Sequence, residues 1–273
     1  MIAVFGATGF IGSKFCEKFR PNVFEMERNI VIPEKSCDKI LYLISTVDNY
    51  NVLTDPYVDI NTNLMHLIKV LENCKDRDVE FTFISSWFVY GETDLPARET
   101  SPCNPKGFYS ITKLAAEQLL ASYCKTFNIK YKIIRLGNVV GNGDGKASKK
   151  KNALQYLINE MREGRDINLY DSGEFYRDII HVDDVSGGIK YIIDHGHPNE
   201  TYNLGSATDP VLFKDVISYL HNELNSESTV GTMEQTEFHK IVQVKSMYLD
   251  CNKLTELGWK PSRTVFQAIH ELI

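Results

Sequence analysis

The feature that most constrains the fold is a glycine-rich loop between a short apolar strand and a helix. Residues 2–5 are apolar and predict the strand, and the apolar positions that begin at Phe10 recur at helical spacing. A side chain at Gly6 or Gly9 would block the tight turn or the approach of a diphosphate, and Gly12 lets the helix pack closely on the strand. Free N–H groups at the helix N-terminus attract an anion. The loop predicts a dinucleotide-binding site, although a structural turn without ligand has the same pattern; its residues are Gly6, Thr8, Gly9, Phe10, Ile11 and Gly12.

Strand and helix patterns alternate through the first half of the chain. Short β-branched runs are followed by longer stretches with one apolar face, and the run KILYLI at 39–44 is apolar throughout, as in a parallel strand covered on both faces. This alternation predicts right-handed crossovers and a doubly wound parallel α/β sheet. The expected strands are 2–5, 23–27, 39–44, 80–84 and 130–136, and the expected helices begin near 10, 61 and 109.

Beyond residue 140 the pattern loosens, which divides the chain into two expected parts. Residues 142–151 are rich in glycine and lysine, and short helices then mix with short strands up to the last residue. We expect a dinucleotide-binding domain over residues 1–140 and mainly a small substrate-binding cap over 141–273. Residues 177–200 regain the strand-then-helix pattern, so we expect the chain to return to the first domain there.

Composition narrows the class of protein. The 273 residues carry a formal charge of −6, so a binder of nucleic acid by electrostatic attraction is not expected. No apolar stretch approaches the ~18 to 20 residues that cross a bilayer, and no membrane association is expected. The six cysteines are scattered without a C-x-x-C pair, which favours free thiols in a reducing, cytoplasmic compartment. The seven histidines show no H-E-x-x-H spacing, so no metal site is expected.

The second expected strand ends where the adenosine ribose of a dinucleotide would lie. Glu27 at this end would accept hydrogen bonds from the ribose hydroxyls and repel a 2′-phosphate, which favours NAD. Arg28 beside it would instead bind that phosphate, which favours NADP. A solvated Glu–Arg pair in a turn explains the same residues. The choice between NAD and NADP therefore stays open.

Tyr109 and Lys113 are four residues apart on an expected helix and lie on one face of it. Ser86 follows the expected strand 80–84, at the edge of the sheet where doubly wound folds bind ligands. Such a set supports carbonyl–alcohol interconversion, in which a hydride moves to or from a nicotinamide and the tyrosine moves a proton. A cation ~6 Å from the phenol, at an effective dielectric of ~20, contributes about 2.8 kcal/mol, or about two pKa units. Lys113 and an oxidised nicotinamide together would thus bring the phenol toward neutrality, with Ser86 bonding the same substrate oxygen.

Purely structural roles are the alternatives for Ser86 and Tyr109. Tyr109 would then be a core residue of an amphipathic helix, and Ser86 would cap the end of a strand.

Nine motifs follow one another along the chain, namely GATGFIG at 6–12, KILYLIS ending at 45, DINTN at 59–63, SSWFVYG at 85–91, YSITKLAAEQ at 109–118, RLGNVVG at 135–141, DSG to RD over 171–178, YNLGS at 202–206 and LGWKP at 257–261. With these motifs in this order the chain resembles the extended short-chain dehydrogenases/reductases that act on nucleotide sugars, the family of UDP-galactose 4-epimerase. The resemblance covers nearly the whole chain and implies a Rossmann-like sheet with a C-terminal cap. It also implies NAD or NADP as cofactor and a nucleotide-diphosphate sugar as substrate.

The resemblance implies roles for individual residues. Ser86, Tyr109 and Lys113 match the family's catalytic set, and Tyr109 and Lys113 also contact the cofactor there. Asn61 matches the buried asparagine that supports the lysine, with a helix-supporting amide as the alternative reading. The positions that match cofactor-lining residues are Leu43, Ile44 and Ser45.

On the substrate side, Asn138 and Arg177 match positions that contact the nucleotide diphosphate of the sugar. A salt bridge to Asp178 is the alternative for Arg177. A homodimer is implied through the helix that carries Tyr109 and the helix within 58–75, with Leu114 and Leu119 in the interface.

Two departures from the family pattern bear on function. The segment 13–39 is short, so a strand and its helix are expected to be missing after the first βα unit, together with part of the adenine pocket. Trp87 and Phe88 stand where family dehydratases carry an acidic pair, which disfavours 4,6-dehydration and suggests packing against the sugar. The favoured function is a nucleotide-diphosphate-hexose 4-epimerase that works through a 4-keto intermediate. The alternatives are an NADPH-dependent 4-keto-sugar reductase and a non-catalytic dinucleotide-binding sensor.

Overall fold

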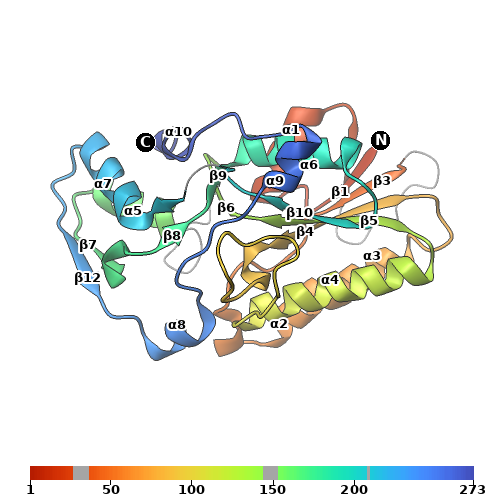
Figure 1. The fold of residues 1–273 in the computed structure, drawn as a ribbon, viewed down its shortest axis with the longest axis horizontal. Coiled ribbons are helices and arrows are strands. Elements are labelled where there is room, and N and C mark those ends of the chain that lie inside the picture. Colours follow the sequence, from red (N-terminus) through yellow and green to blue (C-terminus); the bar gives the residue numbers. More distant parts are fainter. Residues whose placement is uncertain (27–36, 144–152, 208–209) are drawn as a thin grey trace.

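The computed structural model describes residues 1–26, 37–143, 153–207 and 210–273. Six parallel strands form the central sheet in the order β10-β5-β4-β3-β1-β2 (Figure 1). They are β1 (Ile2–Phe5), β2 (Val23–Met26), β3 (Lys39–Tyr42), β4 (Glu80–Ser86), β5 (Lys130–Leu136) and β10 (Glu200–Leu204). The expected doubly wound α/β class is confirmed. The strand expected over 39–44 ends instead at Tyr42, because the chain leaves the sheet there to line the site described below.

Helices cover both faces of this sheet, and the alternation of side chains in each strand explains why. Ile2 and Val4 point into one apolar cluster, while Ala3 and Phe5 point into another. The first cluster lies under α1 (Phe10–Phe19) and α6 (Val182–His195), which pack against each other. The second lies under α3 (His66–Glu72) and α4 (Phe108–Thr126), which run along the lower side of the sheet in Figure 1.

The helix expected near residue 61 has a wider turn at its start. A short α2 (Tyr57–Asp59) continues into the π-helical stretch η2 (Ile60–Met65) and then into α3. Such wider turns are uncommon and often lie at functional sites. Here the π-helical stretch contains Asn63, a buried side chain of the candidate site.

The sheet is short on the side of the first βα unit. β2 pairs with β1 alone, and no described strand continues the sheet beyond it. The chain then passes to β3 on the opposite side of β1. The strand and helix that were expected to be missing therefore have no counterpart in the described ranges.

The second half of the chain builds small elements beyond the carboxyl ends of the strands (Figure 1). Three strand pairs occur there, β6 (Asn138–Val140) with β9 (Ile179–His181), β7 (Ile167–Tyr170) with β12 (Val230–Met233), and β8 (Tyr176–Arg177) with β11 (Val211–Leu212). The helices there are α5 (Ala153–Arg162), α7 (Phe213–Glu223), α8 (Glu237–Val242), α9 (Asn252–Leu257) and α10 (Val265–His270), and η4 (Asp171–Gly173) is a single 3₁₀ turn. Two further 3₁₀ turns, η1 (Asn51–Leu53) and η3 (Trp87–Val89), lie in the first half of the chain. The chain also returns to the main sheet, where β10 pairs with β5 and α9 packs on β10.

Two classes of feature are not observed within these ranges. No helix in the described part of the chain is long and apolar enough to cross a membrane. No disulfide joins the six cysteines, all of which the structure describes.

A buried ion pair joins α4 to the central sheet. Arg135 of β5 donates two hydrogen bonds to the carboxylate of Glu117, at 3.1 and 2.7 Å, and both side chains are less than a tenth exposed. The guanidinium also lies 4.7 Å from the centre of the Tyr90 ring. The pair holds the helix that carries Tyr109 and Lys113 against the strand beside β4.

We expect Glu117→Gln to lower the free energy of unfolding by about 3 kcal/mol or more, because it leaves the Arg135 cation buried without its counter-charge. Urea unfolding measures the change. Gln118→Ala, at the exposed next position of the same helix, should stay within about 0.5 kcal/mol of the unchanged protein. Equal decreases in the free energy of unfolding of the two variants would show that the Arg135–Glu117 pair does not stabilise the fold.

Candidate active site

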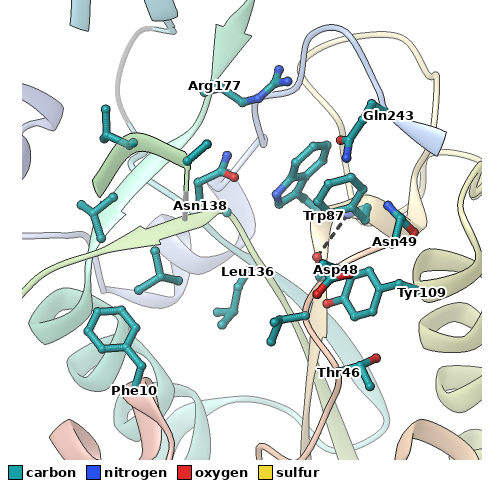
Figure 2. Close-up of a pocket in the computed structure, with 18 of the residues that line it drawn as sticks. Phe10, Thr46, Asp48, Asn49, Trp87, Tyr109, Leu136, Asn138, Arg177 and Gln243 are labelled. Atoms are coloured by element: carbon teal, nitrogen blue, oxygen red, sulfur yellow. Dashed lines mark hydrogen bonds between the residues drawn. The ribbon is translucent and has the colours of Figure 1, made fainter. Parts of the chain in front are cut away.

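A cleft of about 2000 Å³ opens between the carboxyl ends of the sheet strands and the elements of the second half (Figure 2). Almost all the residues singled out from the sequence line it, namely Gly6, Thr8, Gly9, Phe10, Ile11, Gly12, Leu43, Ile44, Ser45, Ser86, Trp87, Phe88, Tyr109, Lys113, Asn138 and Arg177. Glu27 and Arg28, the expected ribose-contacting residues, lie outside the described ranges. Asn61 does not line the cleft and is corrected below.

The glycine loop has the shape that a diphosphate site needs. Gly6 adopts φ +87°, in the left-handed region that favours glycine. A Cβ on Gly12 would lie 2.1 Å from the carbonyl oxygen of Gly6, so only glycine allows this close approach of helix and strand. Gly9 is the N-cap of α1, and no described side chain caps that end of the helix. The free N–H groups and the positive end of the helix thus face the cleft, and this backbone fits the diphosphate of NAD or NADP.

The Tyr109 phenol lies between two serine hydroxyls at the floor of the cleft. Its phenol lies beside the hydroxyls of Ser86, at the end of β4, and of Ser45, which follows β3. The ring of Phe88 packs edge-on at 6.0 Å between ring centres. Burial raises the pKa of the Tyr109 phenol to about 12, while the two serine hydroxyls oppose this rise. Without cofactor the phenol is therefore protonated at neutral pH.

Lys113 lies one helical turn from Tyr109, and only 1% of it is exposed. Its amine donates to the carbonyl oxygen of Ile84 at 2.7 Å and lies 4.2 Å from the centre of the Phe83 ring. Burial lowers the pKa of this amine to about 7, so it is only partly charged at neutral pH. The pKa decrease that we expected Lys113 to cause at Tyr109 is therefore not seen in the protein alone. A bound oxidised nicotinamide, which brings its own positive charge, would have to lower the pKa of the Tyr109 phenol instead.

The asparagine that supports this region is Asn63, not Asn61. The Asn61 side chain is exposed, whereas Asn63 is 2% exposed. The Asn63 amide donates to Thr46 and Thr112 at 2.8 and 2.9 Å, and its oxygen accepts from the Ser45 hydroxyl and the Thr46 N–H at 3.1 and 2.9 Å. The family resemblance implied this role for Asn61, two residues earlier, whereas the π-helical stretch turns position 63 toward the site.

Arg177 is a half-buried cation on the opposite side of the cleft. Its guanidinium donates to three backbone carbonyls, those of Tyr176, Val244 and Lys245, and lies 4.4 Å from the Phe175 ring centre. Burial lowers the pKa of Arg177 to about 10, which leaves it positive at neutral pH.

No carboxylate in the described ranges forms an ion pair with Arg177. Asp178 instead accepts from the backbone N–H groups of Ser206 and Leu249, at 2.6 and 3.0 Å. The alternative of an Arg177–Asp178 salt bridge is therefore wrong. A guanidinium held by neutral groups suits an incoming anion.

Trp87, Phe88 and Asn138 also line the cleft. The Trp87 and Phe88 rings stack at 3.9 Å between centres, and Trp87 lies 5.7 Å from the Arg177 guanidinium. The Asn138 amide donates to the carbonyl oxygen of Asp178 at 3.0 Å. Figure 2 shows Asn138 and Arg177 on one side of the cleft and Trp87 and Tyr109 on the other.

Sequence reasoning missed two groups of cleft residues. Thr46, Asp48 and Asn49 follow the serine that was predicted, and their position just after a strand is a signal that could have found them. Gln243, which faces the same space in Figure 2, comes from the loop after α8, where no sequence pattern marks it. No group of three metal-ligating side chains occurs among the residues that the structure describes.

Comparisons with known proteins find a matching family and similar structures. Residues 23–205 match the sequence model of the NAD-dependent epimerase/dehydratase family. A dTDP-glucose 4,6-dehydratase of Mycolicibacterium smegmatis is 25% identical over 85% of this chain and 69% of its own length. A GDP-6-deoxy-D-mannose reductase of Pseudomonas aeruginosa is 26% identical over 86% of this chain and 79% of its own length. The structure of a UDP-glucose 4-epimerase from Thermotoga maritima is similar with a TM-score of 0.85 and 22% identity, over 99% of this chain and 96% of that one.

The buried amine of Lys113 predicts a pH-dependent stability. Its pKa is about 7 in the folded protein, against 10.5 for an unperturbed lysine side chain. Between these values the unfolded chain binds one more proton, so stability rises with pH. We expect Lys113→Met to be more stable than the unchanged protein at pH 6.5, with the difference narrowing toward pH 10.

Urea unfolding across this pH range measures the difference. Lys125→Met, at an exposed position of the same helix, should show a difference that does not change with pH. If the stability difference between Lys113→Met and the unchanged protein stays constant from pH 6.5 to pH 10, the lowered pKa of the Lys113 amine is contradicted.

Proposed function

Because this chain belongs to the NAD-dependent epimerase/dehydratase family, a family of NAD(P)-dependent enzymes, we propose that it is a nucleotide-diphosphate-hexose 4-epimerase that works through a 4-keto intermediate. The observation that carries the proposal is the position of Tyr109. Its phenol lies between two serine hydroxyls, one helical turn from a buried lysine, in the cleft that the glycine loop and Arg177 also line.

In this proposal one group of residues binds the cofactor and another moves the proton. The glycine loop binds the diphosphate of NAD or NADP, and Leu43, Ile44 and Ser45 contact the cofactor beside it. The bound cofactor supplies the hydride acceptor and donor. Lys113 binds the cofactor next to Tyr109. The phenol takes the proton of the sugar C4 hydroxyl and returns it, and Ser86 holds the same oxygen.

On the substrate side, Arg177 and Asn138 bind the diphosphate of the sugar nucleotide, and the aromatic pair Trp87 and Phe88 packs against the hexose. Arg177 supports this role because its charge has no described carboxylate partner while its orientation is set by backbone carbonyls. Two aromatic side chains cannot act as the acid and base that removal of water needs. This disfavours 4,6-dehydration, although a relative with 25% identity carries that name.

One observation favours a second candidate, an NADPH-dependent 4-keto-sugar reductase. The pKa of the phenol is raised to about 12, so Tyr109 carries its proton in the cofactor-free protein. A reductase begins each turnover with the protonated phenol, whereas an epimerase begins with the deprotonated one. An epimerase and a reductase share these residues and differ in whether the cofactor leaves after each cycle.

We expect the protein to retain NAD through purification and to interconvert C4 epimers of UDP-, dTDP- or GDP-hexoses without added cofactor. Product analysis on a panel of these sugars and their 4-keto forms, with and without NADPH, measures this. Tyr109→Phe should slow turnover by about 10²-fold or more while it keeps the cofactor. Tyr57→Phe, at a position 70% exposed, serves as the control.

Two outcomes of the panel would contradict the proposal. NADPH consumption with a 4-keto sugar and no epimerisation would identify the reductase. No turnover of any sugar by the cofactor-loaded protein would favour a non-catalytic sensor.

We also propose a homodimer through the face formed by α2, η2 and α4, which we call the helix face. It exposes large apolar side chains, Val58, Met65, Ile111 and Leu119, at 37–48%. These elements pack on one another along one side of the sheet (Figure 1). Exposed apolar side chains gathered in this way are typical of interfaces between subunits. Leu114, the other leucine expected in the interface, is partly buried against the chain's own cluster around Trp87.

Light scattering after size exclusion should give twice the chain mass of 31.2 kDa. Ile111→Asp should shift the protein to the monomer mass, because a carboxylate would be desolvated in the interface. Val230→Asp, at a position 46% exposed on β12, should leave the mass unchanged. A monomer mass for the unchanged protein at micromolar concentration would contradict the dimer.

A further inference from the structure

A carboxylate in the active-site cleft has no role in the mechanism above. Asp48 belongs to the segment that leaves the sheet after β3, and its half-buried side chain lines the cleft. Figure 2 shows Asp48 between Trp87 and Tyr109. Its Oδ1 accepts from the Tyr50 N–H at 2.7 Å, which fixes the direction of the carboxylate. Its Oδ2 is not buried and accepts no hydrogen bond from the described part of the chain, so this oxygen is open to a ligand.

The groups that share this space with Asp48 are neutral. The Gln243 amide faces the same space in Figure 2, and its side chain has no hydrogen-bond partner among the described residues. The Ser86 hydroxyl and the stacked rings of Trp87 and Phe88 line the cleft as well. Carboxylate and amide oxygens accept hydrogen bonds from hydroxyls, and aromatic faces cover apolar C–H groups. Together these groups suit a ring that carries several hydroxyls.

The position of Tyr109 indicates which part of the sugar Asp48 meets, and this step rests on the proposed function. The phenol acts on the oxygen of C4. The neighbours of C4 in the ring are C3, which carries a hydroxyl, and C5, which carries the C6 group. A carboxylate next to the phenol therefore meets the 3-hydroxyl or the C6 group. A hydroxyl at either place can donate to Asp48, whereas a carboxylate at C6, as in a hexuronic acid, brings two negative charges together.

The described cations of the cleft do not offset this charge. Three lysines lie in ion pairs, Lys106 with Glu92 at 2.7 Å, Lys240 with Glu237 at 2.7 Å and Lys245 with Asp171 at 3.7 Å. The Lys113 amine is buried and donates to the Ile84 carbonyl. Burial lowers the pKa of His239, which leaves this ring neutral at pH 7. Arg177 lies across the cleft from Tyr109 and binds the diphosphate in the proposed function (Figure 2).

We propose that Asp48 makes the site selective for neutral hexoses. It accepts a hydrogen bond from a sugar hydroxyl next to C4, and its charge repels the carboxylate of a hexuronic acid. The inference deepens the proposed function, because it names the class of sugar that the same site takes.

Binding measurements test the proposal without requiring turnover. The protein is saturated with NAD and titrated in a calorimeter with UDP-glucose, dTDP-glucose and GDP-mannose, and with the three corresponding uronic acids. On the nucleotide that binds most tightly, we expect the neutral sugar to bind at least about tenfold more tightly than its uronic acid, because hydrogen bonding and repulsion act in the same direction. Asp48→Asn should reduce this preference to less than about threefold, mainly by tighter binding of the uronic acid, because the amide oxygen still accepts but carries no charge.

The chain offers a matched control for the substitution. Asp55 accepts from the Tyr57 N–H at 2.9 Å, as Asp48 does from Tyr50, but its side chain is exposed and does not line the cleft. Asp55→Asn should therefore leave the preference unchanged. Asp48→Ser, also neutral, should act like Asp48→Asn, and either variant that folds decides the question.

The outcomes separate this inference from the proposed function. Equal affinities for neutral and acidic sugars, tighter binding of the uronic acid, or a preference that persists in both position-48 variants would overturn the role of Asp48, even if the protein epimerises hexoses. A preference that depends on Asp48 would support the role even if the sugar panel shows reduction instead of epimerisation. Absence of binding of all six sugar nucleotides would overturn both.

Discussion

The hydrogen bond from the Lys113 amine to the carbonyl oxygen of Ile84 is the contact on which the site depends. It joins α4 to the carboxyl end of β4, and thereby sets Tyr109 of the same helix beside Ser86 of that strand. The amine is buried beside the Phe83 ring, and burial lowers its pKa to about 7, so the contact costs stability whenever the amine is protonated. Strongly shifted pKa values of this kind gather at functional sites, where stability is given up for chemistry.

A layer of polar side chains under the sheet edge completes this arrangement. β3 ends at Tyr42, and the residues that follow leave the sheet with their hydroxyls turned toward Asn63 and Tyr109. The π-helical stretch on the other side brings Asn63 to meet them. Each donor and acceptor of the Asn63 side chain has a partner, which is the condition under which a buried polar network specifies one geometry.

The cleft exists because the chain crosses from the sheet to the second half and back. Asp178, next to Arg177, accepts hydrogen bonds from Ser206 after β10 and from Leu249, so three distant segments meet at one carboxylate. Arg177 in turn is held by carbonyls of residues 244 and 245. The cation that faces the cleft is thus positioned by backbone from the far end of the sequence.

The sequence by itself determined the α/β class, the glycine loop and the grouping of Ser86, Tyr109 and Lys113, because each depends on local patterns: alternation, glycines between strand and helix, and a four-residue helical spacing. It did not locate Asn63, since helical spacing cannot show a π-helical turn. It also did not give the raised pKa of Tyr109, the neutral partners of Arg177 or the place of Asp48 in the cleft. Those features depend on which groups are brought together and removed from water, and that is decided only when segments distant in the chain pack against one another.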